Sequence, residues 1–237
     1  MSVRFWTEGL GSFILAVVLA LVVRWAFVEA YVIPTNSMNP TLFSNDHIFV
    51  NKLVYGVRLP FSSDWILRWG TPGRGELIVF RRQEDSGPFY IKRVVGVPGD
   101  RIFIENNHVY VNETLVERRA PNPKELAPLG DLLLEGNPLW IETLGDNSYG
   151  VLYGTNAAPS APIGPLEVPY GSYFVLGDHR DLSDDSRTWA PDRFVSEEDI
   201  VGRASMIWLS CDETLPLVPF LCDPRKVRWQ RIFQLVD

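Results

Sequence analysis

The sequence is poor in metal-binding residues and in positive charge. It has two cysteines and three histidines in 237 residues, and 22 Lys and Arg against 29 Asp and Glu give a net charge of −7. Two cysteines cannot complete a four-ligand zinc site, and His47, His108 and His179 are scattered, so we expect no structural metal. Because nucleic-acid-binding surfaces are usually basic, the acidic balance argues against a nucleic-acid partner.

Cys211 and Cys222 are eleven residues apart. In an oxidising compartment they could close a small loop through a disulfide bond. They could equally be two unrelated buried or free thiols. The spacing alone decides nothing, so the state of this pair stays open at the level of sequence.

Glycine and proline are abundant, with 18 of each, which is more than a helical bundle carries. Short runs rich in Val, Ile, Tyr and Phe predict a mainly β protein. The expected strands lie within residues 47–55, 75–80, 90–100, 101–113, 173–187 and 200–210. Asn106 and Asn107 form a good turn pair, so 101–113 is expected to be a hairpin.

The length suits one substantial domain, or a core with an insertion. Residues 114–170 change character, with Pro, Gly and Asn between short apolar runs. We predict that these residues form an inserted, loop-rich lobe. The turn-rich segment 57–74 is either an irregular part of the core or an aromatic patch that touches lipid.

The N-terminal region holds the longest apolar run, from Leu10 to Val28. As a helix these residues would span roughly 28 Å, about one hydrocarbon thickness. Arg24 can extend toward the membrane interface. A cleaved signal peptide is the alternative, but apolar character continues past Arg24 with no spacer before the fold. A retained anchor at 10–28, after a short tail at 1–9, is therefore the favoured interpretation.

Ser37 is a candidate nucleophile, because it lies in the proline-bounded turn PTNSMNPTL at residues 34–42. A serine needs a base to act as a nucleophile. His179 beside Asp178 makes a triad conceivable, although no GxSxG elbow is present. Lys92, in the run YIKRVV, would be a base if burial lowered the pKa of its amine. The strand pattern by itself favours a surface charge at Lys92, and nothing in the spacing places it near Ser37.

These segments together resemble type I signal peptidases, the membrane-anchored serine endopeptidases with a Ser-Lys pair that remove N-terminal signal peptides. The matching blocks occur in the expected order. They are the apolar segment with PTNSMNPTL, then GELIVF, YIKRVVGVPGD, and GDHRDLSDDSR followed by VGRA. The resemblance covers most of the chain outside 114–170, and all blocks in order are a specific signal.

The resemblance implies a role for each matching residue. Ser37 would be the nucleophile and Lys92 the general base, and the oxyanion hole would be the Ser37 N–H with the Thr35 hydroxyl. Ser183 would orient the Lys92 amine. The supporting ionic scaffold would be Arg93, Asp178, Asp185 and Arg187. The substrate pockets would be lined by Ile33, Pro34, Met38, Leu42, Tyr90 and Ile91.

The resemblance also implies the fold: a core of packed antiparallel sheets from 29–104 and 171–237, with a β-rich, loop-rich lobe inserted at 105–170.

The setting of the reaction is implied as well. The expected enzyme hydrolyses secretory preproteins with small residues at positions −1 and −3, through an acyl-enzyme and without a metal or cofactor. It would be a single-pass protein of the inner or plasma membrane, in contact with lipid, with its catalytic domain on the extracytoplasmic side. No obligate protein partner is evident. Where the family loop often reads GDNRDNS, this chain has His179 and Leu182, which puts one polar contact in doubt.

Two other classes remain open. A self-cleaving Ser-Lys repressor domain would need a DNA-binding helix-turn-helix and no apolar N-terminus. A membrane-anchored β module without catalysis would serve as a binding scaffold. The intact set of Ser37, Lys92 and Ser183 makes the second less favoured.

Overall fold

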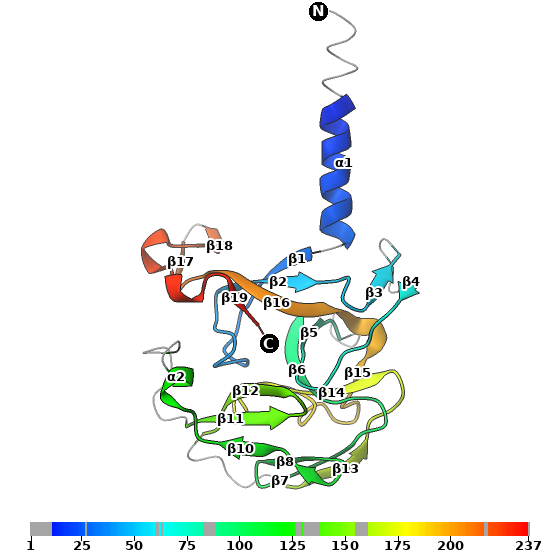
Figure 1. The fold of residues 1–237 in the computed structure, drawn as a ribbon, viewed down its shortest axis with the longest axis vertical. Helices are drawn as coiled ribbons and strands as arrows, with labels where there is room; N and C mark the ends of the chain where they lie inside the picture. Colours follow the sequence, from blue (N-terminus) through cyan, green and yellow to red (C-terminus); the bar gives the residue numbers. More distant parts are fainter. Residues whose placement is uncertain are drawn as a thin grey trace, which may run out of the picture.

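The computed structural model describes a β body from which a single long helix projects (Figure 1). The described residues are 11–26, 28–59, 62, 64–82, 89–126, 129, 138–154, 161–215 and 218–236. All pairings between the described strands are antiparallel, which confirms the prediction of a mainly β protein with antiparallel sheets.

The helices are few and short apart from the first. They are α1 (Gly11–Ala26), α2 (Pro123–Leu126), and the 3-10 turns η3 (Glu197–Asp199), η4 (Pro224–Lys226) and η5 (Trp229–Arg231). The strands are β1 (Val28–Val32), β2 (Asp46–Asn51), β3 (Gly56–Arg58), β4 (Trp65–Arg68), β5 (Leu77–Phe80), β6 (Tyr90–Gly96), β7 (Arg101–Glu105), β8 (His108–Val111), β9 (Thr114–Leu115), β10 (Glu117–Arg119), β11 (Leu139–Leu144), β12 (Asn147–Leu152), β13 (Ile163–Glu167), β14 (Ser172–Leu176), β15 (Val195–Ser196), β16 (Ile200–Ser210), β17 (Thr214–Leu215), β18 (Val218–Cys222) and β19 (Gln234–Leu235).

The main sheet has the strand order β1-β2-β16-β5-β6-β14-β15, with β19 paired to β16. The turn containing Ser37 connects β1 to β2, whereas Lys92 lies on β6. The long strand β16 pairs with both β2 and β5, so it joins the two halves of the sheet. Residues that are 55 apart in sequence are thereby brought to one site.

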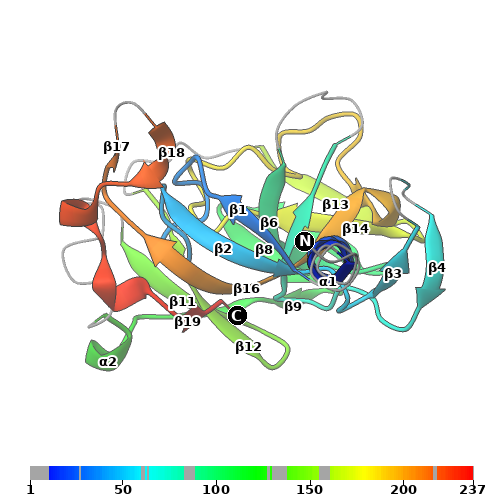
Figure 2. The same ribbon diagram turned by 90° about the horizontal axis from the view of Figure 1, so that it is seen from above.

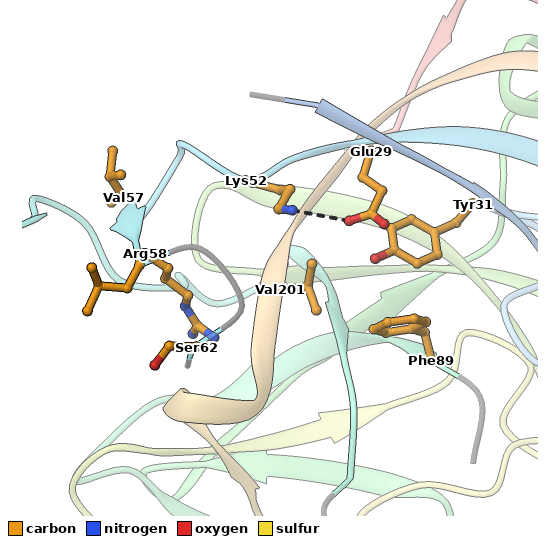
Figure 3. Close-up of a pocket in the computed structure, with 10 residues that line it drawn as sticks. Glu29, Tyr31, Lys52, Val57, Arg58, Ser62, Phe89 and Val201 are labelled. Atoms are coloured by element: carbon orange, nitrogen blue, oxygen red, sulfur yellow. Dashed lines mark hydrogen bonds and ion pairs between the residues drawn. The ribbon is translucent and has the colours of Figure 1, made fainter. Parts of the chain in front are cut away.

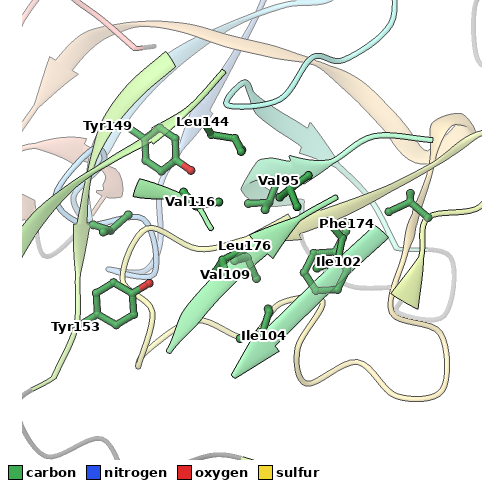
Figure 4. Packing of buried hydrophobic residues seen from close by; sticks show 13 residues of the cluster. Val95, Ile102, Ile104, Val109, Val116, Leu144, Tyr149, Tyr153, Phe174 and Leu176 are labelled. Atoms are coloured by element: carbon green, nitrogen blue, oxygen red, sulfur yellow. The ribbon is translucent and has the colours of Figure 1, made fainter. Parts of the chain in front are cut away.

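Two smaller sheets, β10-β11-β12 and β13-β7-β8-β9, lie at the end of the body away from α1 (Figure 1). They pack on the main sheet through a hydrophobic cluster (Figure 4), in which Val95 and Phe174 of the main sheet meet Ile102, Val109 and Leu144. Burying such side chains contributes about 1.5–3 kcal/mol each, so this cluster fixes the small sheets against the main one.

The expected hairpin at 101–113 is confirmed. Glu105 pairs with His108 across Asn106 and Asn107, whose φ angles are 50° and 63°. Two consecutive positive φ values match the twist of the flanking strands, and asparagine tolerates them better than most residues. The turn chemistry read from two adjacent asparagines thus determines the register of this hairpin.

Segment 57–74 is not an irregular part of the core. It contributes β4 and most of β3, a two-stranded sheet in which Gly56 pairs with Arg68. Ile66, Leu67 and Trp69 are each more than half exposed. The sequence did not predict the pairing of β3 with β4, because the side chains of β4 do not alternate between buried and exposed.

Helix α1 rises away from the β body and is seen end-on in Figure 2. Its 16 residues fall inside the predicted 10–28 anchor; residues 1–10 and 27 lie outside the described part of the chain. Within the described ranges, no helix combines the length and the apolar character needed to cross a membrane. The side chains of Phe13, Ile14 and Leu15 are mostly exposed.

Cys211 and Cys222 form a disulfide bond, with their Cα atoms 5.7 Å apart. The bond joins the end of β16 to the end of β18, and so closes the small β17-β18 hairpin against the main sheet. The two cysteines are therefore a disulfide pair rather than two unrelated thiols, which the sequence could not decide.

Candidate active site

Ser37 lies in a tight turn that is held by its own backbone. The Asn39 N–H donates to the Asn36 carbonyl at 3.1 Å, and the Leu42 N–H donates to the Met38 carbonyl at 2.9 Å. The side chains of Met38 and Leu42 are fully buried and anchor the turn in the core, whereas Ser37 is half-buried. The turn therefore presents the serine hydroxyl at the surface on a rigid support.

The side chain of Lys92 reaches the Ser37 hydroxyl from strand β6. Its Nζ lies 2.9 Å from Ser37 Oγ. Strand β6 pairs with β5 on one side and β14 on the other, so Lys92 is only 3% exposed. The expectation from strand pattern alone, a surface charge on an edge strand, is therefore wrong.

The buried position of Lys92 changes the chemistry of its amine. Burial lowers the pKa of Lys92 from 10.5 to about 8. The carboxylates of Asp185, Asp184 and Asp178 oppose this by stabilising the ammonium, and the Arg187 cation adds to the lowering. At pH 7 roughly a tenth of the Lys92 side chains are then neutral amines, which can accept a proton.

The Thr35 hydroxyl lies on the exposed side of the serine. Its Oγ1 donates to Ser37 Oγ at 3.2 Å. This places a second hydroxyl beside the atom that would attack a carbonyl group.

A fully buried ion pair between Arg93 and Asp178 lies next to the turn that contains Ser37. Arg93 donates through Nε and Nη2 to the two carboxylate oxygens of Asp178, at 2.8 and 2.7 Å. Thr41 Oγ1 donates to the same carboxylate at 2.5 Å, and the Arg93 guanidinium lies 4.0 Å from the centre of the Tyr149 ring. The expected scaffold pair is present, and it connects the serine turn, β6 and β12.

Asp185 forms the second expected pair, with Arg187. Its carboxylate accepts from Arg187 Nε and Nη2, both at 2.8 Å, and from the Gly177 N–H at 2.9 Å. Burial raises the pKa of Asp185, but the hydrogen bonds and charge of Arg187 outweigh this and hold it below its usual range. The carboxylate therefore stays charged and fixes the loop that follows β14.

The hydroxyl of Ser183 is buried, and its interaction with the Asp185 carboxylate helps to lower the pKa of that group. The expected hydrogen bond to the Lys92 amine is not formed in this structure. A Cβ at Gly177 would overlap the Ser183 side chain and would lie 2.6 Å from the Ser37 carbonyl oxygen. Glycine at 177 thus permits the loop to pack directly against the serine turn.

The same loop contacts Ser37 through its backbone. The His179 N–H donates to the Ser37 carbonyl at 3.1 Å. Arg180 next to it is buried and donates to both oxygens of Glu142, at 2.8 and 2.5 Å, while the Tyr153 hydroxyl also donates to Glu142 at 2.8 Å. Sequence reasoning missed this network, because its members are far apart in the chain and belong to no local pattern.

A cavity of about 200 Å³ opens beside the serine turn. Four of the six expected pocket residues line it, namely Ile33, Pro34, Tyr90 and Ile91. Met38 and Leu42 lie fully buried in the core instead and do not line it. The lining residues that were not expected are Tyr31, Val32, Ile48, Val79 and Phe89.

Within the described part of the chain, a single group brings three possible metal ligands together. His47, Cys211 and Cys222 place their ligand atoms within 4.8 Å of one another. The two sulfur atoms are bonded to each other, so they are not available as thiolates.

The arrangement at Ser37 contains the groups that acyl transfer requires. A half-exposed hydroxyl touches a buried amine with a lowered pKa, and an apolar cavity lies next to them. A nucleophile within hydrogen-bond distance of its base is the pattern of covalent hydrolases.

The sequence matches the family described as "Signal peptidase, peptidase S26" over residues 6–209. It is 36% identical to signal peptidase I of Pseudomonas fluorescens, over 85% of this chain and 72% of the relative. It is 32% identical to signal peptidase I of Rickettsia massiliae, over 94% of this chain and 91% of the relative.

A crystal structure of a signal peptidase I from Enterococcus faecalis shares 26% identity, covering 56% of this chain and 97% of its own, with a TM-score of 0.33. That score is too low to support any conclusion about the fold. The family match, in contrast, covers most of the chain, and the relatives exceed 30% identity. The chain therefore belongs to the signal peptidase family, peptidase S26, and is a serine endopeptidase of the signal peptidase I type.

Proposed function

We propose that this chain is a membrane-anchored endopeptidase that removes signal peptides from exported preproteins, with Ser37 as nucleophile and Lys92 as general base. The observation that carries the proposal is the 2.9 Å contact between Ser37 Oγ and the buried Lys92 amine. Its pKa of about 8 makes the neutral form accessible under physiological conditions.

In the first step the neutral Lys92 amine takes the proton of Ser37 as Oγ attacks the scissile carbonyl. The Ser37 N–H and the Thr35 hydroxyl donate to the oxyanion that forms. Lys92 then gives its proton to the leaving amine, and the acyl-enzyme remains. Water, deprotonated by Lys92, attacks the ester; the peptide leaves as a carboxylic acid, and Ser37 recovers its proton.

The remaining site residues hold this pair in place. Asp185 and Arg187 fix the loop beneath Lys92, and Arg93 with Asp178 supports the serine turn. The Ser183 hydroxyl is proposed to turn toward the Lys92 amine during the reaction. Its burial beside Asp185, whose carboxylate also acts on the Lys92 amine, supports that role.

The cavity lined by Ile33, Pro34, Tyr90 and Ile91 is proposed to accept small side chains at positions −1 and −3 of the substrate. Its volume of about 200 Å³ and its apolar lining suit alanine-sized groups. In the main sheet β1 is an end strand, paired only with β2 among the described strands. An extended substrate can therefore add to its free edge by strand pairing.

The membrane location is proposed from α1. Its exposed side chains between Phe13 and Val18 are apolar, and it projects away from the β body (Figure 1). Water-exposed apolar surface of this kind favours lipid. The disulfide between Cys211 and Cys222 supports an oxidising, extracytoplasmic setting for the catalytic domain.

We further propose that 29–104 and 171–237 form the catalytic core and that 105–170 is the inserted lobe. The contact of Glu142 with Arg180 supports a role for this lobe in holding the catalytic loop. The exposed Ile66, Leu67 and Trp69 are proposed to rest at the lipid surface.

The test is cleavage of a purified preprotein in detergent or lipid by wild type, Ser37→Ala, Lys92→Ala and Lys92→Arg. Only wild type should release product with the mature N-terminus, because guanidinium stays protonated and cannot act as a base. A chelator should leave the rate unchanged. Folded wild type that cuts none of several preproteins would instead favour a binding scaffold.

A further inference from the structure

A cavity of about 450 Å³ lies between β1, β3 and β16, outside the proposed active site (Figure 3). Its charged groups are balanced. Lys52 Nζ lies 3.2 Å from a carboxylate oxygen of Glu29, and the Asp199 and Glu198 carboxylates offset the charge of Arg58. The cavity therefore indicates no particular ligand, in contrast to a group of side chains at the far end of β2.

That group lies where three strands meet at the disulfide. His47 is on β2, Cys211 directly follows β16, and Cys222 ends β18. His47 pairs with Leu209 of β16, and residues two apart on a strand share a face, so Cys211 lies diagonally across from His47. The main sheet itself therefore brings the imidazole and the first sulfur atom together, and the disulfide adds the second.

The three side chains have a mostly buried setting. His47 is 4% exposed and Cys211 is fully buried, whereas Cys222 is half-buried. The Trp208 ring packs edge-on against the imidazole, with 5.2 Å between the ring centres, which limits rotation of the imidazole. Cys222 is therefore the member of the group that solvent, a reductant or an ion reaches first.

The spacing of the ligand atoms suits a tetrahedral zinc ion. All three atoms lie within 4.8 Å of one another. Zinc binds thiolate sulfur at about 2.3 Å and imidazole nitrogen at about 2.0–2.1 Å, which places neighbouring ligand atoms roughly 3.6–3.8 Å apart. The distance from His47 Nε2 to Cys222 Sγ, 3.7 Å, already lies in that range. The two sulfur atoms are too close only while they are bonded, and rotation of the cysteine side chains separates them once the bond is broken.

Reduction makes both sulfur atoms available. A dithiol reductant breaks the bond between Cys211 and Cys222, becomes a disulfide itself, and leaves a proton on each cysteine sulfur. Zn²⁺ then displaces both protons, and the two thiolates balance its charge beside a neutral imidazole. A newly made chain carries the same two thiols before an oxidant has joined them.

We propose that His47, Cys211 and Cys222 form a zinc site in the reduced protein, with water as the fourth ligand. Zinc there replaces the disulfide as the link between β16 and β18, and it adds β2 to that link. None of the three ligands belongs to the proposed catalytic residues, so the site does not depend on the proposed peptidase function.

The experiment measures metal binding by the purified full-length protein in its two redox states. One sample stays oxidised. The other is treated with a dithiol, which is then removed by gel filtration without oxygen, and near-UV circular dichroism shows whether it is folded. Each sample is titrated with Co²⁺, whose bonds to thiolate give a charge-transfer absorption band, and Zn²⁺ is then added to displace it. The reduced protein should bind a single ion per chain with this band, and the oxidised protein should bind none.

Thermal unfolding provides a second measurement of the same binding. Zn²⁺ at about 100 times its Kd should raise the Tm of the reduced protein by roughly 5–10 °C. The Tm of the oxidised protein should not change, because its sulfur atoms are bonded to each other.

His47→Phe removes the nitrogen ligand and keeps a ring that packs against Trp208. It should weaken zinc binding to the reduced protein roughly 100-fold or more, because losing a ligand costs more than the about 10–100-fold that losing an outer partner costs. His108→Phe is the matched control, since His108 lies on β8 in a different sheet, and it should leave zinc binding unchanged.

Several results would overturn the site. They are folded reduced wild type that takes up neither ion, equal zinc affinity in reduced His47→Phe, and equal uptake by the oxidised protein. Reduced wild type that stays unfolded in the presence of zinc would overturn it as well. Should His47→Phe fail to fold, the comparison of oxidised with reduced wild type decides alone.

Discussion

Glu142 on β11 forms an ion pair with Arg180, in the loop that contacts Ser37, and replacing Glu142 should lower the stability of the protein. The Arg180 and Glu142 side chains are each only 2% exposed, and they share a two-pronged ion pair. In Glu142→Ala the Arg180 guanidinium would remain buried without its counter-charge. Such a charge cannot be neutralised by losing a proton, because arginine stays protonated.

The size of the effect follows from the burial of the pair. Removing one partner of a buried ion pair lowers the free energy of unfolding by about 3–5 kcal/mol, and we expect a loss of this size here. For a chain of this length, 1 kcal/mol corresponds to roughly 2–4 °C in Tm. Glu142→Ala should therefore lower Tm by about 6–20 °C, as measured by thermal unfolding of the purified protein.

The exposed ion pair of Glu125 with Arg119 provides a control for the Glu142→Ala variant. Glu125 accepts from Arg119 Nη1 and Nη2 at 2.9 and 2.5 Å, in the same two-pronged geometry, but this pair is exposed. Because water solvates either partner when the other is removed, Glu125→Ala should leave Tm nearly unchanged. Both variants delete the same atoms and break a two-pronged ion pair, and each also removes one further hydrogen bond, from Tyr153 to Glu142 and from the Asn122 N–H to Glu125. The main difference between the two sites is burial.

Two results would refute this reasoning. Equal Tm values for Glu142→Ala and Glu125→Ala would show that burial of the pair adds nothing. The double variant Glu142→Leu with Arg180→Met should regain much of the lost stability, because neither charge is then left alone. If it is as unstable as Glu142→Ala, the loss comes from packing rather than from an unpaired charge.

Further predictions concern the site and the disulfide. The pH profile of kcat/KM should rise through about pH 8, because burial lowers the pKa of Lys92 and only its neutral amine is active; a flat profile would contradict this. Ser183→Ala should slow cleavage strongly with Tm unchanged, and an unaltered rate would make Ser183 a packing residue. Replacing Cys211 and Cys222 by serine should cost about 2–4 kcal/mol in a denaturant titration, and an unshifted midpoint would refute that stabilisation.

Sequence reasoning succeeded where a feature depends on neighbouring residues. The hairpin at Asn106 and Asn107 follows from turn chemistry alone. The pairing of Ser37 with Lys92 came from resemblance instead, since 55 residues separate them and strand alternation placed the lysine at the surface. The neighbours of β6 in the sheet bury Lys92, and they are not visible in its own sequence.

Features that depend on distant contacts were missed or misplaced. The resemblance assigned Met38 and Leu42 to the substrate pocket, whereas the turn directs both side chains into the core. Glu142 and Arg180 are 38 residues apart, and neither shows a local pattern. The state of Cys211 and Cys222 likewise depended on whether the fold brings two strand ends together.

The position of β16 in the sheet has a consequence for the synthesis of the enzyme. Among the described strands, β2, after the serine turn, and β5, before the lysine strand, are joined through β16, which follows both of them by more than 100 residues. A nascent chain that has not yet emerged past Ser210 cannot complete the sheet that brings Ser37 to Lys92. The sheet that brings Ser37 to Lys92 is therefore complete only once β16 has paired with both β2 and β5.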